Sequence, residues 1–404
     1  MWGKNGTGAF RAGVSPYNAF RGGVRAAALL SGCAAALLMA VPPVHASGFE
    51  EFRDERRQAF DTFREEFDEA FRQYKETFEA ELEAYRDELR SHWRDPVVSD
   101  NTHWVEYTED RTGRTTVDYE TNEVRVEVPA EAGREGAIDQ LASVLNRTLD
   151  EAYGNDEVTQ RTEERLGRSA RDLGAEGGRR VLSEVSPDDA PEMLARARTE
   201  ERREAAPDGR ERDVTVLTVP LPETRASDKA REYLPLVEEQ AAANGVDEAL
   251  MLAVMHAESY FNPMARSHIP AYGLMQIVPG SAGKDVSQVL YGEPRLLSPD
   301  YLYNPANNIR AGAIYLSILD ERYLSRIEDP ESRLYAVISA YNTGAGNVAR
   351  TFTGGSTNVG EAVEIINGMA PDAVFRALRE RLPYRETREY LVKVAQRLPA
   401  YRDF

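Results

Sequence analysis

Cysteine and histidine are scarce in this 404-residue chain, which contains one of the first and five of the second. A lone cysteine, Cys33, excludes an intramolecular disulfide, so packing alone must hold the fold together. The histidines lie at positions 45, 92, 103, 256 and 268. They show no paired ligand spacing, so we expect no zinc site and no cofactor.

Basic residues are also in the minority, with 49 lysines and arginines against 68 aspartates and glutamates. The resulting net charge is −19. Nucleic-acid binding needs clustered lysine and arginine to displace counterions. The composition therefore argues against a nucleic-acid partner.

The N-terminal segment, residues 1–46, has the pattern of an export signal. Arg21 and Arg25 precede an apolar run from 26 to 41, and small residues follow around Ala46. The run is too short for a stable membrane span. Two alternatives remain open, cleavage after Ala46 and lipidation of Cys33 within Leu-Ser-Gly-Cys, which would attach the protein to the outer membrane. Both place the protein beyond the inner membrane.

A long amphipathic helix is predicted for residues 49–94. Apolar and aromatic residues recur in steps of 3, 4 and 4, an eleven-residue repeat close to the natural pitch of a helix. The remaining positions are mostly charged, so the helix has one narrow apolar stripe. Three alternatives remain open for the stripe: packing on itself or on a neighbouring domain, self-association through 49–93, and binding to a membrane surface. The acidic polar face disfavours the last of these.

Residues 96–222 change from helical to alternating periodicity and predict a small α+β domain. We expect an antiparallel meander, a helix over 136–152, and a further strand that completes the sheet; the strands are predicted at 103–108, 115–119, 124–129 and 214–221. Residues 155–212 are highly charged and poor in apolar residues. They predict exposed helix or a partly disordered linker.

Residues 226–404 predict a compact, mostly helical domain. Asp247 is placed to cap one helix. Asn304-Pro305 and Asp329-Pro330 each put proline at a first helical position. The fold class expected for the whole chain is therefore α+β, with a mostly α domain after a small domain that contains an antiparallel sheet.

One acidic residue in this domain has the features of a general acid. The helix that begins after Asp247 is apolar without a break from 249 to 255, and Pro263 ends it. Glu258 therefore lies in the last turn of a buried helix. Desolvation and the negative helix terminus both favour its protonated form, as a general acid requires. On composition alone, a surface glutamate that closes a helix remains an equal alternative.

Three further segments carry polar and aromatic residues that can accompany this acid. They are residues 271–277, with Gly273, Met275 and Gln276; residues 339–348, with Tyr341 and Asn342; and residues 386–392, with Tyr390. Taken singly, each tyrosine is more typical of a hydrophobic core. Only the combination indicates a site.

In this order, the segment Glu258-Ser259 with Phe261-Asn262-Pro263 and the three that follow resemble the soluble lytic transglycosylase domain, which is related to goose-type lysozyme (glycoside hydrolase family 23). Residues 304–312 and 104–128 narrow the resemblance to the membrane-bound murein transglycosylase C type. The resemblance covers about residues 90–404. It implies a lysozyme-like domain at 226–404 and a family-specific N-terminal domain at 96–222.

The resemblance implies an enzyme of the periplasm of a Gram-negative envelope whose partner is the peptidoglycan glycan strand. Glu258 would protonate the bond between N-acetylmuramic acid and N-acetylglucosamine and then help to close a 1,6-anhydro ring. The residues implied to bind substrate are Ser259, Gly273, Met275, Gln276, Tyr341, Asn342 and Tyr390. Two other functions remain open, a hydrolytic lysozyme-like muramidase and a non-catalytic glycan-binding or scaffold protein.

Overall fold

The computed structural model describes residues 46–168, 172–207, 209–222, 226–402 and 404. The export-signal and Cys33 predictions fall on residues 1–45 and lie outside the described residues. The chain divides into two units, residues 1–60 and 61–404. Of the first unit, the structure describes only the beginning of helix α1 (Ala46–Arg90).

The predicted long helix is present, and within the second unit its apolar stripe is packed. The stripe residues Phe67, Tyr74, Phe78, Leu82 and Leu89 are all buried. The rings of Phe78 and Tyr272 pack edge to face, with their centroids 6.4 Å apart. Asp68 forms an ion pair with Lys284, with 2.7 Å between the Asp68 Oδ1 and the Lys284 Nζ. Packing against a neighbouring domain is thus confirmed for residues 67–89. Self-association through this helix stays a prediction.

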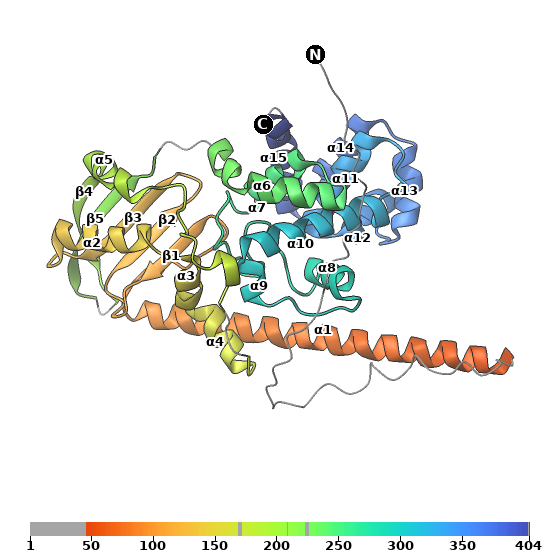
Figure 1. Ribbon diagram of the computed structural model, residues 1–404, viewed down its shortest axis with the longest axis horizontal. Coiled ribbons are helices and arrows are strands. Elements are labelled where there is room, and N and C mark those ends of the chain that lie inside the picture. Colours follow the sequence, from red (N-terminus) through yellow and green to blue (C-terminus); the bar gives the residue numbers. More distant parts are fainter. Residues whose placement is uncertain (1–45, 169–171, 208, 223–225, 403) are drawn as a thin grey trace, which may run out of the picture. The chain divides into compact units, whose positions relative to one another are not determined.

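The small domain contains a five-stranded antiparallel sheet in the order β1-β2-β3-β5-β4 (Figure 1). The strands are β1 (His103–Tyr107), β2 (Arg114–Asp118), β3 (Glu123–Pro129), β4 (Arg198–Ala205) and β5 (Glu211–Pro220). The meander and the strand that completes the sheet are therefore confirmed. Buried valines oppose each other across the ladder, as where Val117 pairs with Val124.

The helices of the small domain differ in extent from the prediction. They are α2 (Gly133–Leu145), α3 (Leu149–Asn155), α4 (Glu157–Arg165) and α5 (Ala190–Arg196), with short 3-10 turns η1 (Gly174–Glu176) and η2 (Pro187–Asp189). The single helix predicted over 136–152 is wrong, because it breaks into α2 and α3. A capping box of Thr148 and Glu151 starts the second helix.

Strand β4 is a second correction, since its residues were predicted as exposed helix or linker. Its sequence, Arg-Thr-Glu-Glu-Arg-Arg-Glu-Ala, has no apolar alternation. It lies at the sheet edge, where charged side chains are tolerated. Ion pairs anchor it, among them Arg203 with Asp213 at 2.8 Å and Arg202 with the buried Glu127 at 2.7 Å. These cross-strand partners cannot be read from the linear sequence.

The C-terminal domain is helical, as expected (Figure 1). Its elements are α6 (Ala226–Asn244), α7 (Glu248–Glu258), α8 (Ala282–Tyr291), α9 (Pro299–Tyr303), α10 (Pro305–Ser317), the π-helical η3 (Ile318–Tyr323), α11 (Pro330–Thr343), α12 (Ala345–Thr353), α13 (Val359–Asn367), α14 (Pro371–Arg381) and α15 (Arg385–Arg402). The predicted cap at Asp247 is confirmed, and Pro305 and Pro330 begin their helices as predicted. The residues before these prolines, Asn304 and Asp329, also accept a backbone N–H of the first turn.

Two searches of the described residues are negative. No helix there combines the length and apolar character needed to cross a membrane. Nor do three or more histidine, cysteine, aspartate or glutamate side chains gather there as a metal site.

Candidate active site

Helix α7 carries Glu258 at its C-terminal end, as the sequence predicts. Asp247 caps its start by accepting the Leu250 N–H at 2.9 Å. All seven residues from Ala249 to Met255 are buried. The helix therefore passes through the core of the domain and brings Glu258 out at its far end.

Ser259, the next residue, holds this helix end to the predicted loop. It is fully buried, and its single hydroxyl proton is shared between Leu274 O at 2.8 Å and Met255 O at 3.1 Å. The first of these bonds joins the Glu258 turn to residues 271–277. The structure thus places Ser259 beneath the acid, in a supporting position.

The loop at 271–277 is tightly constrained. Gly273 has φ +73°, and a Cβ there would lie 2.5 Å from the Asn308 Nδ2. Met275 N donates to Asn308 Oδ1 at 2.8 Å. Gln276 also has positive φ, 47°, and its amide donates to Gly273 O at 2.9 Å. The Gln276 nitrogen is therefore engaged within the loop.

Two tyrosines from different helices meet Glu258. Tyr341 of α11 donates its hydroxyl proton to Met275 O at 2.8 Å. Tyr390 of α15 is buried, and its hydroxyl lies close enough to Glu258 for the two side chains to form a hydrogen bond. Burial and the charge of Glu258 raise the pKa of both phenols well above the ordinary value. Both hydroxyls therefore stay protonated and can act as donors.

The pKa of Glu258 is raised from 4.5 to about 8, chiefly by desolvation. Tyr390 approaches closely enough to oppose this rise, while the negative charge of Glu386 adds to it. Glu258 remains half-buried rather than sealed. Protein atoms thus strip most water from the carboxyl while part of the side chain stays accessible. This is the state a general acid needs near neutral pH.

Asn342 is tied to the same helix as Tyr390. Its Oδ1 accepts the Thr387 hydroxyl proton at 2.7 Å, so α11 and α15 are joined beside the site. Asn342 is half-buried. The contacts described here bring Glu258, Ser259, Tyr341 and Tyr390 together; Gly273, Met275 and Gln276 belong to the loop bound to them.

A known family model matches the part of the chain that carries most of these residues. Residues 235–359 match the family model described as the Transglycosylase SLT domain. Residues 235–359 of this chain are therefore similar to an SLT domain, and we refer to them as the SLT domain. The matched segment includes Glu258, the loop at 271–277 and Tyr341-Asn342, whereas Tyr390 lies beyond it. The predicted resemblance to this domain is confirmed.

The chain is also similar to curated relatives named "Membrane-bound lytic murein transglycosylase C". The Yersinia enterocolitica protein is 47% identical over 186 residues, 46% of this chain and 51% of that protein. The Glaesserella parasuis protein is 44% identical over 192 residues, 47% of this chain and 51% of that protein. The chain thus spans about half the length of the curated relatives it matches.

A solved structure is also similar, the 70-kDa soluble lytic transglycosylase of Escherichia coli. It is 18% identical and the match covers 68% of this chain and 44% of that chain, with a TM-score of 0.33.

Residues outside the predicted set also shape the SLT site. Asn308 is fully buried and donates to Tyr272 O at 2.8 Å and to Leu302 O at 2.7 Å, besides accepting from Met275. Its position in the apolar helix α10 could have signalled a buried polar group that needs partners. Glu386 lies in the predicted segment 386–392, but its negative charge raises the pKa of Glu258 only because the fold brings the two residues close together. No sequence pattern predicts that proximity.

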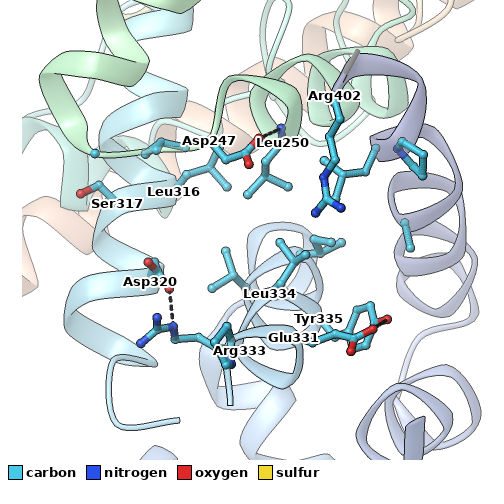
Figure 2. Close-up of a pocket in the computed structure, with 18 residues that line it drawn as sticks. Asp247, Leu250, Leu316, Ser317, Asp320, Glu331, Arg333, Leu334, Tyr335 and Arg402 are labelled. Atoms are coloured by element: carbon cyan, nitrogen blue, oxygen red, sulfur yellow. Dashed lines mark hydrogen bonds and ion pairs between the residues drawn. The ribbon is translucent and has the colours of Figure 1, made fainter. Parts of the chain in front are cut away.

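A large cavity of the C-terminal domain is separate from the candidate active site. It has a volume of about 770 Å³ and is lined by residues that include Asp247, Leu250, Arg333, Leu334 and Arg402 (Figure 2). Asp247 and Leu250 mark the start of α7, whereas Glu258 ends that helix. The cavity and the acid therefore lie at opposite ends of α7.

Proposed function

We propose that this protein is a peptidoglycan lytic transglycosylase. It cleaves the bond between N-acetylmuramic acid and N-acetylglucosamine without water and leaves 1,6-anhydro-muramoyl ends. The observation that carries the proposal is the Glu258 carboxyl, whose pKa of about 8 keeps it protonated near neutral pH. The SLT domain around it and the names of the relatives support the same activity.

One carboxyl group is sufficient for both proton transfers of this reaction. Glu258 gives its proton to the glycosidic oxygen as the bond from muramoyl C1 breaks, and N-acetylglucosamine leaves with a free 4-hydroxyl. The muramoyl C6 oxygen then bonds to C1, and the Glu258 carboxylate takes the C6 hydroxyl proton. The acid returns to its starting state. Ordinary glycosidases divide these tasks between two carboxylates.

The neighbouring residues suit distinct supporting roles. Tyr390 holds its phenolic proton beside the carboxyl, and hydrogen bonding between the two side chains favours the ionised form of Glu258. Asn342 and Gln276 are half-buried amides that can orient sugar substituents. The backbone of the loop at 271–277 is fixed by its own residues Gly273 and Met275 and by hydrogen bonds from Ser259 and Tyr341. These four residues therefore contribute to substrate binding largely by setting the conformation of the loop backbone.

The relatives are named membrane-bound, and we infer that this chain also acts in the cell envelope, in the periplasm. Mapping of the mature N-terminus distinguishes the two anchoring alternatives. A start after Ala46 indicates a free periplasmic protein. A lipid-modified Cys33 indicates outer-membrane attachment.

Mass spectrometry of sacculi digested by the wild type and by Glu258→Gln tests the proposed activity. The wild type should release fragments with 1,6-anhydro ends, and the variant should release none while still binding glycan. Reducing ends in place of anhydro ends would identify a hydrolase. Equal results from the two proteins would leave a binding or scaffold function.

A further inference from the structure

A loop of the small domain reaches the end of the catalytic helix. The Asn101 amide donates to the backbone carbonyl of Glu258 itself, with Nδ2 3.2 Å from the oxygen. Carbonyls in the last turn of a helix have no partner within the helix. Arg397 of α15 fills the same need at His256, with Nη1 2.8 Å from the carbonyl oxygen. Two side chains from elsewhere thus complete the turn that carries the acid.

The loop around Asn101 is held in place without the Asn101 side chain. The Asp100 carboxylate accepts the backbone N–H groups of Thr102 at 2.8 Å and His103 at 2.7 Å. The Asp100 carbonyl accepts the Arg266 N–H at 3.2 Å, which joins the loop to the SLT domain. Truncation of Asn101 therefore removes one donor and leaves the loop docked.

The chain that follows Glu258 needs external support because its backbone is strained. Tyr260 and Phe261 have φ of 50° and 64°, a left-handed conformation that is unfavourable for non-glycine residues. The small domain also holds this segment from a second position, because the Tyr260 hydroxyl donates to Glu120 at 2.9 Å. Asn101 lies in the loop that precedes β1, and Glu120 lies in the loop between β2 and β3.

We propose that Asn101 is a positioning residue for Glu258, which fixes the end of α7 and replaces the water that would otherwise bind its carbonyl. This inference rests on the proposed function. Without this bond the turn that carries the carboxyl is less firmly held and can shift to admit water to the carboxyl. Hydration favours the ionised form, so the pKa of Glu258 would fall from about 8 toward its ordinary value. The small domain thereby helps to keep the acid protonated.

The test compares Asn101→Ala with Asn146→Ala. The control removes the same type of bond, because the Asn146 amide donates to the Ala142 carbonyl of α2 at 2.8 Å on an exposed surface. We would measure kcat and KM for release of anhydro ends across pH, and thermal unfolding of each protein. The Glu258 carboxyl would also be titrated by ¹³C NMR, with Glu258→Gln used to assign its signal, which requires no activity.

We expect Asn101→Ala to lower kcat by about 10-fold with a much smaller change in KM, as a misplaced catalytic group does. The Glu258 titration should move to lower pH, by about one pH unit. The Asn146→Ala variant should match the wild type in both. An unchanged Glu258 titration in Asn101→Ala would overturn the inference, whether or not activity falls, because a purely structural role would not require the titration to move.

The same design separates this inference from the proposed function. A wild type without glycan-cleaving activity would refute the function, and the NMR titration would still report on Asn101. An active wild type with an inactive Glu258→Gln, but with an Asn101→Ala variant that equals the wild type in kcat and titration, would refute only the inference.

Discussion

Replacement of Glu258 by glutamine should stabilise the protein at alkaline pH while abolishing its activity. The pKa of this carboxyl is raised from 4.5 to about 8 in the folded state. Between those pH values the unfolded chain loses the proton while the folded chain retains it, so wild-type stability falls as pH rises. Each pH unit of that interval corresponds to about 1.4 kcal/mol, which sets a ceiling of about 5 kcal/mol.

The measured effect should be smaller than this ceiling, because part of the Glu258 side chain is accessible to water. We expect Glu258→Gln to exceed the wild type by about 2 kcal/mol at pH 9, or about 3 °C in Tm for a folding unit of this size. Below pH 4.5 the carboxyl is protonated in both states, and the two proteins should unfold alike. Scanning calorimetry or denaturant unfolding across pH measures the difference.

Glu248→Gln provides the matched control. Glu248 is exposed in the first turn of the same helix, so its neutralisation should produce no stability gain that grows with pH. If Glu258→Gln and Glu248→Gln showed the same pH dependence, the carboxyl at the helix end would not be desolvated. The proposed general acid would then lose its physical basis.

Two further substitutions should shift the pH–rate profile in opposite directions, and two glycine substitutions should lower stability by different amounts. Tyr390→Phe should raise the pKa of Glu258 further and move the alkaline limb of the rate profile to higher pH, because the phenol lowers that pKa; Glu386→Gln should move the limb to lower pH, because its charge raises the pKa. Shifts in the same direction would contradict the assignment. Gly292→Ala should lower the free energy of unfolding by about 1 kcal/mol, because the φ of Gly292 is +78° while an added Cβ would contact no other atom. Gly273→Ala should cost at least about 3 kcal/mol, since its Cβ would also lie 2.5 Å from Asn308 and the Leu302 carbonyl. Chemical denaturation that found equal losses for the two glycines would refute the close contact.

Local sequence patterns predicted much of the fold because they act over a few residues. The capping side chains of Asp247, Asn304 and Asp329 each accept the backbone N–H three residues later. Strand β4 was missed because its own residues are almost all polar and show no apolar alternation, and because its ion-pair partner Glu127 on β3 lies 75 residues before Arg202. Edge strands depend on such partners more than on burial.

For the candidate site, the sequence by itself predicted an acid at the end of a buried apolar helix, from the unbroken apolar run at 249–255 and the proline that follows it. It also supplied the two tyrosines. Only the tertiary structure decided what surrounds that acid. Asn101 lies 157 residues before Glu258, and Glu386 lies far after it. Hydrogen bonds and desolvation depend on distance in space, so their effects on one carboxyl arise only when the folded chain brings these residues together.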